Sequence, residues 1–177
     1  MIQLIKIQDE QAKYFKECWS LYQEAFPEEE RREKWYHLKS MESRYFNFEA
    51  IIEDSELKGL IGWWDFEQVR YIEHVAVLPE LRSKGYGKKI FTLLKSISPK
   101  PIILEVEPPK DEISKRRIGF YRREGFMLNP HYHLQPPYQG DKGVNLLIMS
   151  YPEAITQEYL EQFRNQYFPL IHFRHQS

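Results

Sequence analysis

Two glycines stand close together in a short segment that could bind phosphate through its backbone, Arg82-Ser83-Lys84-Gly85-Tyr86-Gly87. An apolar, strand-like run precedes this segment, and a helix-like run follows it. The first N–H groups of a helix have no carbonyl partner within the helix, and they point outward at the positive end of its dipole. Such amides suit a diphosphate group. The alternative is that Gly85 and Gly87 only close a tight turn.

Two common phosphate-binding motifs do not fit this segment. A P-loop has four residues between its glycines and a Ser or Thr after its Lys, whereas only Tyr86 separates the glycines here and Lys89 follows Lys88. The dinucleotide-binding fingerprint needs a third glycine at position 90, which is Ile90.

The elements around the segment predict a strand–helix–strand unit. A strand is expected over 69–78, ending before Pro79, and a helix follows with its apolar residues at helical spacing, namely Ile90, Phe91, Leu94 and Ile97. The apolar run 102–106 is expected to be the next strand, in parallel pairing with the first.

The first half of the chain predicts a strand, two helices and a hairpin. A strand over 2–6 is followed by Asp9 as the expected N-cap of a helix that ends at Pro27. The charged run 28–34 is expected to open a second helix. Alternating residues over 45–66, interrupted at 54–56, predict the hairpin, and Gly62 marks a bulge or a close backbone approach.

The last third predicts a capped helix, two strands and a terminal helix. Asp111 or Ser114 is expected to cap a helix that ends near Glu124, with Gly125 in the left-handed conformation. Strands are expected over 126–134 and 144–151. The amphipathic tail, Ile155, Tyr159, Leu160, Phe163 and Tyr167, predicts a final helix that packs on the body or meets a partner.

Arg82-x-x-Gly85-x-Gly87 after a strand, together with Phe120-Tyr121-Arg122-Arg123-Glu124-Gly125-Phe126, resembles the signatures of the GNAT superfamily of N-acetyltransferases. The resemblance extends to the element order from residue 1 to about 151. It implies the GNAT-like acyl-CoA N-acyltransferase fold, of mixed α/β class with a central mixed sheet flanked by helices. We expect one domain over 1–177, with its core over about 1–151 and a helical extension over 152–177.

The resemblance implies that acetyl-CoA is the cosubstrate and that backbone amides from Arg82 to Lys88 hold its diphosphate. Arg82 and Lys84 would add charge, and the strand at 75–77 would offer main-chain hydrogen bonds to the pantetheine arm. The cofactor-binding residues expected on this basis are Val75, Ala76, Val77, Arg82, Ser83, Lys84, Gly85, Tyr86, Gly87, Lys88 and Ser114.

Three positions depart from the family pattern. Ser83 stands where Gly is common, which is harmless if its backbone angles are ordinary. Ser114 and Arg117 stand where Asn and Ala are common, which weakens the expected coenzyme contact of Ser114.

Two residues are the candidates for catalysis of acetyl transfer to an amine by direct attack. Tyr121 matches the tyrosine that faces the departing sulfur in the family, and it is expected to donate a hydrogen bond there. Glu73 is the candidate general base, on the face that alternation assigns to Val75 and Val77, with His74 on the other face. A carboxylate of pKa about 4.3 is a weak base for an amine near 10.4, so the alternative is that Glu73 only pairs with a basic side chain.

Other reactive side chains give weaker predictions. His131 and His133 are two of the three or more ligands that zinc needs, so no metal is expected. With Tyr132 and the loop at Tyr138, they are expected to line the acceptor pocket. Cys18 is expected to be a small buried hydrophobe.

Composition limits the partners. Lys and Arg total 25 against 26 Asp and Glu, so the net charge of −1 disfavours nucleic-acid binding. The sequence contains no run of about 18 apolar residues, so no membrane span is expected. The start of the chain lacks a leader pattern, and we expect a cytoplasmic protein. The expected partner is a small-molecule or peptide amine, and a homodimer is left open. The alternatives to an N-acetyltransferase are a non-catalytic acyl-CoA-binding sensor or a structural interaction module.

Overall fold

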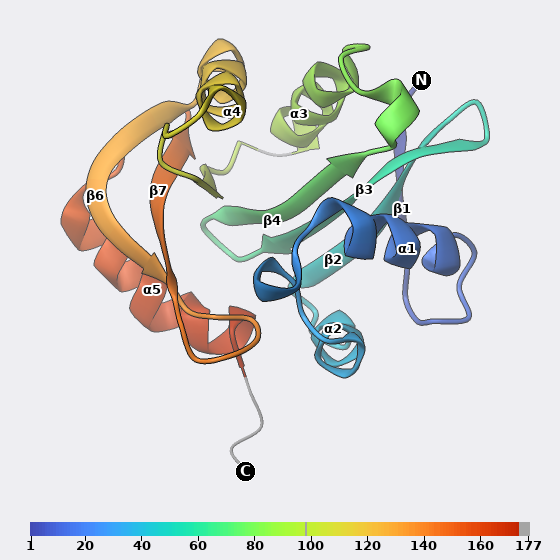
Figure 1. Ribbon diagram of the computed structural model, residues 1–177, viewed down its shortest axis with the longest axis horizontal. Coiled ribbons are helices and arrows are strands. Elements are labelled where there is room, and N and C mark those ends of the chain that lie inside the picture. The colour runs from blue at the N-terminus through green and yellow to red at the C-terminus, as the bar shows by residue number, and fades with distance from the viewer. Residues whose placement is uncertain (98, 174–177) are drawn as a thin grey trace. The chain divides into compact units, whose positions relative to one another are not determined.

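The computed structural model describes residues 1–97 and 99–173, which belong to two compact units, Met1–Lys100 and Pro101–Ser177. Each unit combines strands with helices (Figure 1). Within the described ranges, no helix is long and apolar enough to cross a membrane.

The first unit contains four antiparallel strands in the order β1-β2-β3-β4. The predicted hairpin is confirmed, and its turn places Asp54 and Ser55 at φ 53° and 65°, as a tight two-residue turn requires. The strands are β1 (Gln3–Lys6), β2 (Phe46–Glu53), β3 (Glu56–Asp65) and β4 (Arg70–Val77).

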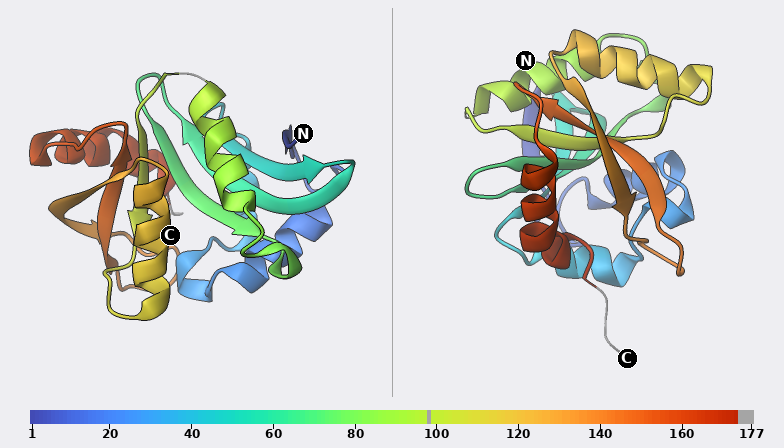
Figure 2. Two further views of the ribbon diagram at one scale, coloured as in Figure 1. Left: turned by 90° about the horizontal axis from the view of Figure 1, so that it is seen from above. Right: turned by 90° about the vertical axis from the view of Figure 1, so that its left-hand side faces the viewer.

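Helices cover both faces of these strands. Figure 2 shows α3 on one face and α1 and α2 on the other. Large apolar and aromatic side chains fill the space between the layers, including Tyr22, Phe46, Phe48 and Trp64, each at most 1% exposed. The helices are α1 (Phe15–Ala25), α2 (Lys34–Met41) and α3 (Tyr86–Ile97), with short 3-10 turns at η1 (Glu28–Glu30) and η2 (Pro79–Leu81).

Two expected helix starts are wrong. Asp9 does not cap α1, because its carboxylate accepts the N–H of Gln11 in a local turn and the helix begins only at Phe15. The charged run forms η1 and then extended backbone at Arg31, so α2 begins at Lys34. The extended segment is what allows Arg32 to point inward, where it is 4% exposed.

A bulge interrupts β4 opposite the position where Gly62 predicted one. Gly62 pairs with His74 and Trp63 pairs with Ile72, so Glu73 is an extra residue in β4. The residue as a whole is partly exposed although its side chain is not, so the exposed surface is main chain. The bulge therefore presents backbone polar groups while it turns the Glu73 side chain inward.

The second unit has the antiparallel strand order β5-β7-β6 and two helices. Its first helix begins as predicted, with Asp111 as the N-cap and Ser114 completing a capping box, and Gly125 follows its end at φ 92°. The elements are β5 (Ile102–Val106), α4 (Glu112–Arg123), β6 (Met127–Gln135), β7 (Val144–Tyr151) and α5 (Gln157–Ile171).

Candidate active site

The segment 82–88, here called the phosphate turn, connects η2 to the first turn of α3. Its side chains at Arg82, Lys84 and Lys88 are exposed. The amides of Tyr86, Gly87 and Lys88 lie in the first turn of the helix, where no intrahelical carbonyl is available to them. The turn therefore offers outward N–H donors, the positive end of a helix dipole and flexible cations, which together suit a diphosphate.

Left-handed backbone conformations shape this turn. Gly85 has φ 82°, a left-handed conformation that glycine adopts without strain. A Cβ added there would meet no atom within 4 Å, so the backbone angle, and not lack of space, is the reason for glycine at this position. Ser83 has φ 62°, which is also left-handed. The replacement of the common glycine by Ser83 was expected to be harmless only with ordinary backbone angles, and this φ is not ordinary for serine. Ser83 therefore holds a conformation that glycine adopts with less strain.

Glu73 forms a buried ion pair with Arg32 on the face of the strands that α1 and α2 cover. Its Oε1 lies 2.5 Å from Nη1 of Arg32, and the two side chains are 0% and 4% exposed. The indole N–H of Trp64 donates to its Oε2 at 2.6 Å. The ion pair that the alternative prediction for Glu73 requires is therefore present. A proton accepted by this carboxylate would leave the Arg32 charge unbalanced in the interior.

His74 lies on the same side of the strand as Glu73. Its Nε2–H donates to the carbonyl of Glu30 at 2.8 Å, and its ring meets Tyr22 and Phe26 edge-on at 4.9 and 4.5 Å. Burial lowers the pKa of His74, so the ring is neutral near pH 7. The expectation that Glu73 and His74 face opposite ways is wrong, because the bulge breaks the alternation between them.

A second buried histidine, His37, completes this interior cluster. Its ring is enclosed by aromatic rings, with centroids 5.1 Å from both Trp19 and Tyr22 and 4.4 Å from Phe48. Within the described part of the chain, neither ring nitrogen has a hydrogen-bond partner. Burial, and then the Arg32 charge, hold the pKa of His37 well below its usual value.

No signal in the sequence marks Arg32 or His37 as site residues. Arg32 belongs to a run of charged residues, which usually lies in solvent, and no local pattern distinguishes it from Arg31. Only the extended backbone between η1 and α2 turns it inward.

Tyr121 lies near the end of α4 in the second unit. Its ring packs against Phe120 and Phe126 at 5.3 and 5.7 Å. Burial raises the pKa of Tyr121, partly offset by Arg117, so the phenol stays protonated at neutral pH and keeps its O–H as a hydrogen-bond donor.

The hydroxyl of Ser114 is engaged in the capping box of α4. It accepts the Asp111 N–H at 3.1 Å and lies 2.9 Å from the Asp111 carboxylate. A coenzyme contact by this side chain would compete with the cap.

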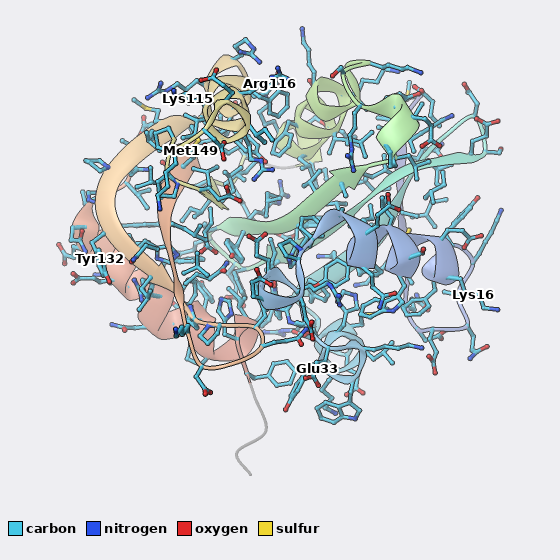
Figure 3. All side chains as sticks on the ribbon, in the orientation of Figure 1. Lys16, Glu33, Lys115, Arg116, Tyr132 and Met149 are labelled. Atoms are coloured by element: carbon cyan, nitrogen blue, oxygen red, sulfur yellow. The ribbon has the colours of Figure 1, made fainter. Side chains whose placement is uncertain are left out.

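The two strand histidines hold the C-terminal segment. His133 lies 2.6 Å from Glu105 and accepts from Arg164 of α5 at 3.3 Å, so its Nε2–H donates to the carboxylate. His131 donates to the carbonyl of Ile155 at 2.6 Å. Tyr132 is 71% exposed and points outward from β6 (Figure 3). Over residues 1–97 and 99–173, no cluster of three metal-binding side chains occurs.

Cys18 is buried, as expected of a small hydrophobe. Burial raises the pKa of its thiol to about 12, so the thiolate is not available at neutral pH.

Comparisons with known proteins agree with this architecture. The model of the acetyltransferase (GNAT) family matches residues 10–126. A GNAT-family protein from Bacteroides thetaiotaomicron is 34% identical, with a TM-score of 0.88 and 99% of both chains covered. YjbC of Bacillus subtilis (strain 168), whose name describes it as an acetyltransferase, is 26% identical over 153 residues. The match covers 84% of this chain and 78% of YjbC.

A more distant structure shares the fold alone. Naa50 of Arabidopsis thaliana, solved with the bisubstrate analogue CoA-Ac-MVNAL, has a TM-score of 0.61 at 18% identity, with 84% of this chain and 97% of Naa50 covered.

Proposed function

Because the chain belongs to the GNAT family of acetyltransferases, we propose that it transfers the acetyl group of acetyl-CoA to an amine by direct attack in a ternary complex. The observation that carries the proposal is the phosphate turn, in which the left-handed Ser83 and Gly85 lead into the first turn of α3. The amides of that turn have no carbonyl partner within the helix. A diphosphate ester is the ligand that this donor set favours. The bisubstrate complex of Naa50 supports coenzyme A as that ligand.

The phosphate turn and β4 would bind different parts of coenzyme A. Amides from Arg82 to Lys88 hold the diphosphate, and the exposed Arg82 and Lys84 add positive charge. The main chain of β4 over Val75–Val77 pairs with the pantetheine arm as a strand would. Ser114 adds a contact only if its hydroxyl leaves the capping box.

Backbone groups at the β4 bulge would stabilise the reacting carbonyl. As the amine attacks, negative charge develops on the thioester oxygen, and a main-chain N–H near Val75 can donate to it. One such donor contributes about 100-fold to 1,000-fold in rate. Tyr121, which is protonated at neutral pH, donates to the departing sulfur.

Glu73 supports this geometry through its side chain. The pairing with Arg32 and the bond from Trp64 fix the inward side of the bulge, and so fix the main chain on its outward side. The competing proposal is that Glu73 is the general base, directly or through water. The pH profile of Glu73→Gln separates them, since loss of a base removes the acidic limb and loss of a positioning group does not.

The acceptor is an amine of a small molecule or a peptide. The test of the proposed function is coenzyme A release by the purified full-length protein with acetyl-CoA and a panel of polyamines, amino acids, aminoglycosides and peptide N-termini. Turnover with one class supports the proposal.

A second candidate function is a non-catalytic acyl-CoA sensor, favoured by the ion-paired state of Glu73. Tight coenzyme A binding with no turnover across the panel would select it. Absence of coenzyme A binding would refute both.

A further inference from the structure

The first turn of α3 is tied to the end of β2 by a single carboxylate. The phenol of Tyr86 donates to Oε2 of Glu53 at 2.8 Å, and Nζ of Lys89 lies 2.9 Å from Oε1. Nζ of Lys89 also lies 4.7 Å from the centre of the Tyr86 ring. Glu53 therefore holds the first and fourth residues of the helix whose N-terminal amides form the phosphate turn.

Glu53 is a rigid anchor for these bonds. It is the last residue of β2, paired with Glu56 of β3 across the tight turn at Asp54 and Ser55. Its side chain is 15% exposed. Bonds from Lys89 and then Tyr86 lower the pKa of Glu53, so it is ionised at neutral pH.

We infer that Glu53 is a positioning residue for coenzyme binding, which orients the first turn of α3 so that its amides meet the diphosphate without rearrangement. The inference rests on the proposed function. Donors that are fixed before the ligand arrives lose little conformational freedom on binding, and affinity rises accordingly. Loss of the anchor therefore weakens coenzyme binding and leaves the chemical step intact.

Electrostatic repulsion alone predicts that removing the Glu53 carboxylate would raise the affinity for coenzyme A. A carboxylate near a bound diphosphate repels it, and removing the carboxylate would also release the charge of Lys89 toward the ligand. In the structure Lys89 already balances Glu53, so little repulsion is available to relieve. The direction of the change in affinity therefore distinguishes positioning from simple repulsion.

The experiment is calorimetric titration of coenzyme A into full-length Glu53→Gln and Tyr86→Phe, with KM for acetyl-CoA and kcat from the acceptor assay. Tyr86→Phe removes one bond to Glu53 and no charge. We expect the dissociation constant and the KM to rise about 3- to 10-fold in each variant, with a much smaller change in kcat. Tyr86→Phe carries the test alone if Glu53→Gln does not fold.

The matched control is Glu56→Gln. Glu56 lies in the same hairpin and pairs with Lys58 at 2.6 Å, so its replacement makes the same charge change without removing a hydrogen bond to α3. We expect its coenzyme affinity to equal that of the wild type. Unchanged or tighter binding by Glu53→Gln and Tyr86→Phe, or an equal loss in Glu56→Gln, would overturn the inference. Failure of the wild type to bind coenzyme A would instead refute the proposed function.

Discussion

Replacing Glu73 by glutamine deprives the buried guanidinium of Arg32 of the carboxylate with which it pairs. Glutamine keeps the shape of the side chain and an acceptor for the Trp64 indole, so the change is confined to charge. The side chains are 4% and 0% exposed with 2.5 Å between the paired atoms, so solvent screens the pair little. Removing one partner of such a pair costs about 3–5 kcal/mol of unfolding free energy.

Removing both charges should cost less than removing one. In Arg32→Met with Glu73→Gln no interior charge from the pair is left, and the double variant should recover about 2 kcal/mol or more relative to Glu73→Gln. Urea unfolding followed by circular dichroism measures all four members of the cycle. A cost below about 1 kcal/mol for Glu73→Gln would refute the argument that this pair is buried and coupled.

The same double variant separates the two roles of Glu73. If Glu73 positions the bulge, restoring the packing restores part of the turnover, and the wild-type acidic limb of the pH profile persists. If Glu73 is the base, turnover stays at background whatever the stability. The acceptor assay from pH 6 to 9 gives the answer.

Three further predictions follow from single side chains. Tyr121→Phe should lower kcat about 10- to 100-fold with little change in coenzyme affinity, because it removes a hydrogen bond to the departing sulfur; an unchanged kcat with a slow amine would remove this role. Gly85→Ala should weaken coenzyme A binding about tenfold through backbone strain at φ 82°, whereas Ser83→Gly should bind at least as well as the wild type; calorimetry measures both, and equal affinities of Gly85→Ala and wild type would contradict the strain argument. The pKa of His37 is lowered in the folded state, so its contribution to stability is present above pH 6.5 and is lost as the pH falls below it. His37→Phe should therefore flatten the acid side of the stability curve by up to about 1.4 kcal/mol per pH unit, and an unchanged slope in urea unfolding at pH 5.5–7.5 would show that His37 is not buried in its neutral form.

Much of the fold follows from local signals in the sequence. The hairpin at 46–65, the capping box of α4 and the left-handed Gly125 depend on residues within a few positions of one another, and all three are as expected. The fold class of the chain is confirmed by the Bacteroides thetaiotaomicron structure. The turn between β4 and α3 also depends on a local signal, because the glycine spacing between a strand and a helix is itself local.

The interior of the candidate site depends on distant residues. The bulge moves Glu73 onto the face of His74 and brings it to Arg32, 41 positions earlier in the chain, and no periodicity in either segment encodes that meeting. At Asp9 a local signal is present but misleading. Its carboxylate accepts a hydrogen bond from Gln11 in a local turn, and α1 begins only at Phe15. Tertiary packing decided both outcomes.

A crystal structure of the protein grown with acetyl-CoA tests the central claim most directly. The account predicts diphosphate oxygens within hydrogen-bond distance, about 2.7–3.2 Å, of the amide nitrogens of the phosphate turn. A coenzyme whose diphosphate lies against any other part of the chain would contradict it.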